Sequence, residues 1–338
     1  METTNPPARR SSWMLRGLAV LLIAYVLFVL ALMWWWDTEP DYFDPVKVTQ
    51  QRATAKQQAV VVGSATTSAL IQSIEVMLDK RGGYLSNDKL PPGVLMDNIP
   101  NWEFGVVTAS RDLTRALRNE FSRSQTQSVE DKDLQEAEPL ISSPNDRWLL
   151  PSSESQYRKA IERIDSYATR LADNDTDDAQ FYARADNLVD FLSVVSTRLG
   201  SLSQRLSASV GQMRIDTDLA NDPNAQQSRP AASSRIVKTP WTKIDDNFYE
   251  ARGYTWALRE QLEAIRVDFG PVLRDKNAMI SLEQVIREIE EAQKPLGSPM
   301  VLNGAPFGFF GNHSLVLANY ISRANAALIE LRELLKRG

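Results

Sequence analysis

The sequence predicts an all-α protein, with one transmembrane helix followed by a multi-helix, bundle-like extracytoplasmic domain. The first observation is an uncharged apolar run at residues 17–36. The second is a series of stretches in which apolar residues recur every three or four positions, while strand-like alternation is scarce. The chain has 338 residues, 43% of them hydrophobic and 24% charged, so it is long enough to bury a sizeable core.

The apolar run, GLAVLLIAYVLFVLALMWWW, has the length of a membrane span. At about 1.5 Å per residue it reaches roughly 30 Å, the thickness of a hydrocarbon core. Trp13 precedes the run and Trp34, Trp35 and Trp36 end it, as suits the two interfaces, so these tryptophans are the predicted anchor residues. A cleaved signal peptide is the alternative, but the run is longer than its apolar region and ends in bulky residues where a peptidase requires small ones. A retained anchor is therefore predicted.

The charges beside the run predict its orientation. Three arginines precede it, and the next charges after it are acidic (Arg9, Arg10 and Arg16; Asp37, Glu39, Asp41 and Asp44). The positive-inside rule makes 1–16 a cytoplasmic tail, 17–36 the anchor and 37–338 the extracytoplasmic domain. In a Gram-negative host this domain is periplasmic and the anchor lies in the inner membrane.

Helical spacing then predicts the elements of the body in order. The first helix is expected at about 53–80 and ends at two glycines, and Pro91, Pro92 and Pro100 separate it from the next. A polar stretch at 127–150 leaves room for a short helix, and a Pro, Gly and aromatic stretch at 295–311 precedes the last helix. The remaining helices are expected at about 103–126, 152–171, 178–210, 242–267, 278–293 and 314–336.

Two observations suggest that the body has two halves. Residues 216–235 are rich in Asn, Gln, Ser, Ala and Pro, which predicts a flexible loop that could join them. The string SRDLTRALR at 110–118 is echoed by ARGYTWALR at 251–259, and each follows a Trp and a long helix. Related halves are one interpretation, and chance similarity between helical sequences is the other.

Composition and missing motifs exclude several classes of function. Without the first 36 residues the chain carries 35 bases against 42 acids, a net charge of −7, which disfavours nucleic-acid binding. The absence of cysteine excludes disulfides, thiol nucleophiles and Cys-ligated metals. Phosphate loops, dinucleotide fingerprints and the common hydrolase and zinc-protease motifs are also absent. No catalytic residue, cofactor or metal site is therefore predicted, and a non-enzymatic protein is favoured.

The only histidine and several aromatic residues are the remaining candidates for function. His313 suits a proton carrier or metal ligand, but the favoured interpretation is structural, with Asn312 or Ser314 as N-cap of the last helix. The aromatics are expected to pack between helices. If the loop at 305–311 is exposed, Phe307, Phe309, Phe310 and His313 become candidate contacts for a partner protein or the membrane surface. The aromatics in question are Trp102, Phe104, Trp148, Trp241, Trp256, Phe307, Phe309 and Phe310.

Several strings resemble an uncharacterised bacterial family, catalogued as domain of unknown function 2333. They are GGYLSND at 82–88, PNWEFG at 100–105, RDLTRALR at 111–118, LPSSES at 150–155, AQFYARADNL at 179–188 and TRLGSLSQRLSASVG at 197–211. The resemblance covers nearly the whole chain. It implies a Gram-negative host and an inner-membrane, periplasm-facing placement, and it implies no activity, cofactor or site residue.

The leading hypothesis is a membrane-anchored periplasmic helical protein that acts as a non-enzymatic binding or scaffolding component of the cell envelope. Its expected partners are the lipid bilayer, through the N-terminal helix, and another envelope protein, with no nucleic acid. One alternative is a carboxylate-dependent enzyme on an envelope polymer or lipid, which requires two opposed acids in a cleft. Another is a ligand-sensing module that signals through a partner, because only about 16 residues lie in the cytoplasm.

Overall fold

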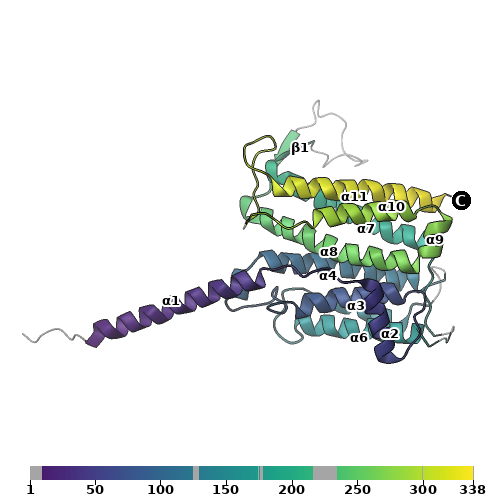
Figure 1. Ribbon diagram of the computed structural model, residues 1–338, viewed down its shortest axis with the longest axis horizontal. Coiled ribbons are helices and arrows are strands. Elements are labelled where there is room, and N and C mark those ends of the chain that lie inside the picture. The colour runs from purple at the N-terminus through teal and green to yellow at the C-terminus, as the bar shows by residue number, and fades with distance from the viewer. Residues whose placement is uncertain are drawn as a thin grey trace, which may run out of the picture.

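The computed structural model describes residues 10–124, 129–173, 175, 178–215, 234–298 and 300–337, and within them the protein is all-α. Figure 1 shows α1 projecting alone from a body of packed helices. The helices are α1 (Arg10–Trp36), α2 (Pro45–Lys56), α3 (Ser64–Asp79), α4 (Asn98–Ala116), α5 (Lys132–Ile141), α6 (Ser153–Leu171), α7 (Ala185–Ser207), α8 (Ile244–Asp268), α9 (Gly270–Asp275), α10 (Met279–Ala292) and α11 (His313–Lys336). Two short strands, β1 (Gln212–Ile215) and β2 (Ser234–Val237), form an antiparallel pair. The predicted fold class is confirmed.

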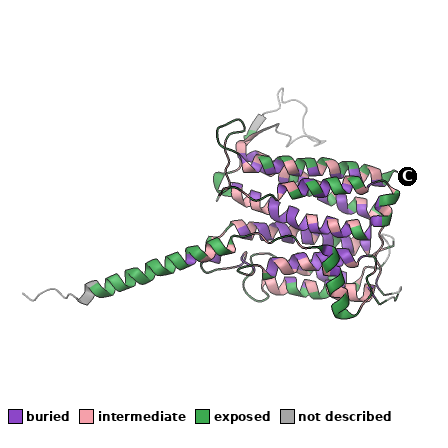
Figure 2. Ribbon diagram, in the orientation of Figure 1, coloured by how far each residue is buried: buried purple, intermediate pink, exposed green. Residues whose placement is uncertain are grey.

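Within the described residues α1 contains one segment, Trp13–Trp36, that is long and apolar enough to cross a membrane, as an anchor or a signal sequence. Its side chains are exposed almost throughout, as the green ribbon of Figure 2 shows. Trp13, Trp34 and Trp35 are exposed, whereas Trp36 is partly buried because the backbone of Gly82 packs against its ring. Gly82 has a φ of +83°, which favours glycine at this contact.

The body consists of two four-helix groups with the same internal arrangement. In the first group, α3 packs on α4 and α6, and α5 packs on α4 and α6. In the second group, α7 packs on α8 and α11, and α10 packs on α8 and α11. The groups meet chiefly where α4 lies along α8, in the middle of the body (Figure 1). Each group is therefore an up-down-up-down bundle.

Two glycines allow α4 and α8 to approach closely. A Cβ on Gly253 would lie 1.9 Å from the carbonyl oxygen of Trp102, and a Cβ on Gly105 would lie 2.2 Å from that of Glu250. Both neighbours are backbone atoms, which a rotamer change cannot move away. The indoles of Trp102 and Trp256 meet beside this crossing, with ring centroids 5.1 Å apart, and both are buried as expected.

The echoed strings occupy corresponding places in the two groups. Arg111 of α4 donates to the carbonyl oxygens of Ile141 and Ser143, at the end of α5. Arg252 of α8 likewise donates to three carbonyl oxygens at the end of α10, those of Ala292, Gln293 and Lys294. In both groups a cation therefore satisfies the carbonyl groups that end the third helix.

The last arginine of each string also makes a corresponding contact in the two groups, an ion pair with the third helix. Arg118 pairs with Glu138 of α5 at 2.6 Å, and Arg259 pairs with Glu290 of α10 at 2.9 Å. The same two kinds of contact thus recur in both groups. Residues 216–233 of the expected joining loop lie outside the described residues. The helices on either side of it, α7 and α8, belong to the same group, and the chain passes between groups at 172–184.

One expected helix was wrong, because residues 53–80 form two helices. Gln57 ends α2 with a φ of 55°, and α3 starts only after Gly63, which has a φ of +95° and lies against the ring of Phe181. The apolar residues between them continue the helical spacing, so periodicity could not reveal the break. The next helix starts earlier than expected, at Asn98, because Pro100 lies in the first turn, where backbone N–H groups need no helical acceptor.

Candidate functional site

Residues 37–44, which we call the strap, join α1 to α2 and lie along α8. The carboxylate of Glu39 accepts two hydrogen bonds from the guanidinium of Arg252, one of them 2.6 Å long at Nε. The backbone N–H of Phe43 donates to Glu260, and its ring meets that of Trp256 edge-on, with centroids 6.0 Å apart. Since the strap is held at both positions, α1 joins the body through a fixed connection.

Arg252 is the centre of this connection. Its side chain is only 7% exposed, and it bridges the strap carboxylate and the carbonyl end of α10. Burying an ion pair costs desolvation free energy, which full hydrogen bonding offsets. Nearby, the guanidinium of Arg259 lies 4.6 Å from the ring centroid of Tyr42, a cation–π contact that holds the strap at a further point.

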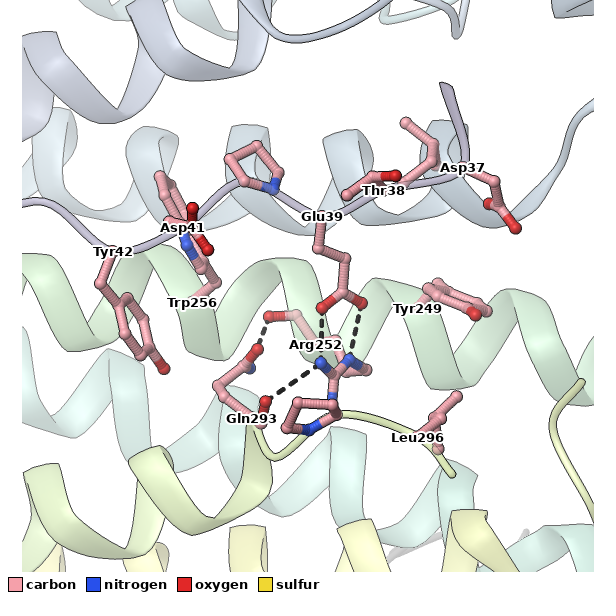
Figure 3. A pocket seen from close by; sticks show the side chains of 13 residues that line it. Asp37, Thr38, Glu39, Asp41, Tyr42, Tyr249, Arg252, Trp256, Gln293 and Leu296 are labelled. Carbon is pink, nitrogen blue, oxygen red and sulfur yellow. Dashed lines mark hydrogen bonds and ion pairs between the residues drawn. The ribbon is translucent and has the colours of Figure 1, made fainter. Parts of the chain in front are cut away.

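A cavity of about 430 Å³ lies between the strap, α8 and the loop after α10, as the close view in Figure 3 shows. Its acids all come from the strap, and the other walls are aromatic, apolar or amide side chains with Arg252. Burial raises the pKa of Asp37. The opposed acids that the enzyme hypothesis requires are not brought together in this cavity. The lining residues are Asp37, Thr38, Glu39, Pro40, Asp41, Tyr42, Ile99, Tyr249, Arg252, Trp256, Gln293, Pro295 and Leu296.

The other buried acids have structural partners. Glu103 of α4 pairs with Lys80 and accepts from the backbone N–H groups of Leu85 and Ser86, both at 2.8 Å, which fixes the loop after α3. Asp268 at the end of α8 accepts from the backbone and hydroxyl of Thr66, both at 2.7 Å. Burial raises the pKa values of Glu103 and Asp268. The described residues contain no group of three or more His, Asp or Glu that could hold a metal ion.

The structure brings three of the four predicted contact residues together. Phe307 and Phe309 are fully exposed, at 104% and 98%, and Phe310 is 68% exposed and meets Phe309 edge-on. His313 is not part of this surface. It begins α11, with Asn312 as N-cap, and its Nδ1 accepts from the N–H of Leu302 at 3.0 Å. This hydrogen bond ties the base of the loop to the helix, which agrees with the structural interpretation.

Further exposed apolar residues lie at the end of the body that carries Phe307, Phe309 and Phe310. We call this the α1 end, because the strap enters there, and α4 begins there with Asn98 donating to Asp37 at 3.3 Å. The α1 end carries the loops at 80–97, 142–152 and 293–312, together with the described residues of 208–243 (Figure 1). The exposed apolar residues of the last three segments include Trp148, Leu149, Leu150, Trp241, Phe307, Phe309 and Phe310, and we call these seven residues the apolar loop surface.

The sequence itself indicates that part of the apolar loop surface lies outside the helices. The run WLL at 148–150 stands between Pro144 and Pro151, where no helix can bury it. Trp241 follows Pro240 and precedes the first turn of α8, so it lies outside the helical seam that buries Trp256. The gathering of these residues at one end is a property of the topology, which periodicity alone does not give.

The fold and the site define a helical domain that follows one apolar helix and is joined to it by a fixed strap. The chain belongs to the family described as "Uncharacterized protein conserved in bacteria (DUF2333)", whose model matches residues 8–338. The resemblance noted in the sequence is thereby confirmed. No curated protein and no solved structure matches the chain.

Proposed function

We propose that this chain is a single-pass inner-membrane protein whose body acts in the periplasm as a non-enzymatic binding or scaffolding component of the cell envelope. In this proposal α1 is retained as the anchor, with the three arginines before it in the cytoplasm. The body then offers its helical faces and the strap cavity to another envelope protein. The bilayer is the partner of α1, and no nucleic acid is involved.

The observation that carries the proposal is the fixed strap. A flexible tether would let the body move freely, but the buried contact of Glu39 with Arg252 and the contacts of Tyr42 and Phe43 hold the strap against α8, and Trp36 at the end of α1 packs on Gly82. A domain held at a set orientation above a membrane suits the presentation of a surface to a partner. The acids that a catalytic function would use are either paired or confined to one wall of the cavity.

In-cell photo-crosslinking of the full chain tests this proposal. A photoreactive residue at position 329 probes an exposed face of α11, position 296 probes the cavity, and position 280 probes the opposite end of the body. A reproducible adduct with one envelope protein from position 329 or 296, absent from position 280, is the expected result. Adducts from none of the three would contradict a protein partner.

The cavity favours a second candidate, a ligand-sensing module. One wall is the strap itself, which is continuous with α1, so a small molecule bound there would act directly on the connection between anchor and body. Native mass spectrometry of the full chain extracted from membranes checks this, with Leu296→Trp as the variant that reduces the space. A co-purifying mass that the variant loses would favour sensing, and the absence of any added mass in the wild type would count against it.

A further inference from the structure

We propose that the α1 end of the body lies on the leaflet from which α1 emerges, with the apolar loop surface inserted at the level of the lipid headgroups. This inference rests on the proposed anchoring by α1. It assigns the exposed phenylalanines to lipid, and it leaves the helical faces and the cavity for a protein partner.

The topology places the loops where they can reach the membrane. In an up-down-up-down bundle the first and third connections lie at one end. Because α4 and α8 both start beside the strap, these connections lie at the α1 end in both groups. The loop at 142–152 reaches the one at 80–97 through Tyr84, whose hydroxyl donates to the carbonyl of Asn145 at 2.8 Å. Loops from both groups therefore lie at the end of the body from which the chain leaves for α1.

The chemistry of the loops suits a lipid interface. The stretch at 295–311 contains no charged residue and ends in APFGFFG, whose phenylalanines are exposed. The corresponding connection of the first group presents Trp148, Leu149 and Leu150, and Trp241 stands at the start of α8. Tryptophan and other aromatic residues favour the headgroup level, where an apolar ring can leave water. Exposed aromatic and apolar residues thus occur on the loops of both groups at this end.

Exposed cations stand next to exposed apolar residues in three of the four segments, and one of these apolar residues, Trp148, belongs to the apolar loop surface. Lys89 precedes Leu90, Arg147 precedes Trp148, and Lys238 follows Ile236 by two positions. No ion pair joins these three cations to another described residue. A cation beside an inserted apolar residue can meet lipid phosphate, which is the pattern of interfacial segments. The strap acids Asp37 and Asp41 line the cavity, whereas Asp88, Asp97 and Asp146 lie on the loops of this end.

The geometry favours lipid over a protein as the occupant. The seven residues stand on separate loops of both groups, and they do not line any of the described cavities. A partner protein would have to cover all of these tips around the emerging α1. The leaflet already surrounds α1 in the proposed topology, and the strap keeps the body turned toward it. Because α1 and the apolar loop surface lie at the same end, lipid is the partner that this surface is inferred to meet.

Single spin labels on the full chain test the inference, because the protein has no cysteine of its own. Phe309→Cys reports on the apolar loop surface, Leu22→Cys on the middle of α1, and Ile280→Cys, where the native residue is 80% exposed, on the opposite end of the body. Each labelled chain is reconstituted into vesicles of phosphatidylethanolamine and phosphatidylglycerol. The accessibility of the label to oxygen and to a water-soluble nickel complex gives its depth, and Leu150→Cys is the second probe if Phe309→Cys does not fold.

The expected result is a label at 22 in the bilayer core, a label at 309 at the headgroup level and a label at 280 in water. A label at 309 as accessible to nickel as that at 280, with the label at 22 still in the core, would overturn the inference and leave the anchor standing. A label at 22 in water would overturn the anchoring proposal and the inference with it. Crosslinking of position 309 to a protein in cells, together with a water-exposed label at 309 in pure lipid, would assign the surface to that protein instead.

Discussion

At the end of the body opposite α1, which we call the far end, the loops turn their aromatic side chains inward, whereas in the described loops of the α1 end only Tyr84 is buried and the other aromatic side chains are exposed. Phe121, Phe181 and Phe269 from three far-end segments pack together, with ring centroids 5.2 to 5.7 Å apart. Among the described residues, the large exposed apolar side chains of the far end are aliphatic, such as Val129 and Ile280. The bundle can therefore close its core with loop aromatics, and the α1 end does not use Phe307, Phe309 or Trp148 in this way. Their exposure points to a contact outside the chain.

The largest expected effect comes from breaking the packing on which both ends depend. Gly253→Ala places a Cβ 1.9 Å from the Trp102 carbonyl oxygen, so α4 and α8 must move apart. Overpacking of this kind should cost about 3 kcal/mol of the free energy of unfolding. Thermal unfolding in detergent measures it. Gly200→Ala in α7 is the matched control, because its Cβ would meet nothing closer than Nδ2 of Asn325 in α11, 3.8 Å away, and it should leave stability unchanged or raised. An equal loss in both variants would contradict the close crossing.

The next largest effect is expected from replacing Arg252, and the corresponding arginine of the first group, Arg111, serves as its control. Arg252→Ala leaves Glu39 without its partner and should cost about 2 kcal/mol, because a partly buried carboxylate loses its counter-ion. Hydrogen exchange at residues 38–43 should also accelerate, since the strap is released. Arg111→Ala removes the same cap from α5 but touches no strap residue, so exchange at 38–43 should stay at the wild-type rate. A strap that stays protected in Arg252→Ala would show that other contacts hold it.

An introduced aspartate at each end of the body tests whether only the α1 end meets lipid. Phe309→Asp and Ile280→Asp both change an exposed side chain, so each should alter stability by less than about 0.5 kcal/mol. Chymotrypsin cleaves at exposed phenylalanines, and insertion should slow cleavage at Phe307 and Phe310 in vesicles relative to detergent. Transfer of one phenylalanine ring from water is worth about 1.5 to 3 kcal/mol, so Phe309→Asp should restore cleavage by at least about tenfold. Ile280→Asp should leave it slow, and equal rates in all three chains would argue against insertion.

A further comparison is a pH dependence at the strap. Burial raises the pKa of Glu260, against the opposing charge of Arg259, from its ordinary value of 4.5 to about 8. The folded protein therefore keeps a proton that the unfolded chain releases, and this group's contribution to stability is lost as pH rises from about 4.5 to 8. Glu260→Gln removes this contribution. The stability of the variant relative to wild type should rise between pH 5 and pH 8, and a constant difference would mean that Glu260 is charged in the folded state.

The all-α class and most helices could be predicted, because a buried helix face repeats every three or four residues whatever it packs against. The break at Gln57 could not, since it depends on a left-handed residue and not on hydrophobicity. The exposed phenylalanines were identified as candidates from their place in a proline- and glycine-rich stretch. Arg252 was not, because its role needs Glu39, a partner 213 residues away that only the fold brings near.

Photoreactive lipids in living cells test the central claim most directly, since they report which residues of the unmodified full chain meet the leaflet. A diazirine near the headgroup should leave adducts on α1 and on peptides that contain 148–150 and 307–310, and none on 269–280. Adducts confined to α1 would contradict the claim, because the body would then stand clear of the membrane that anchors it.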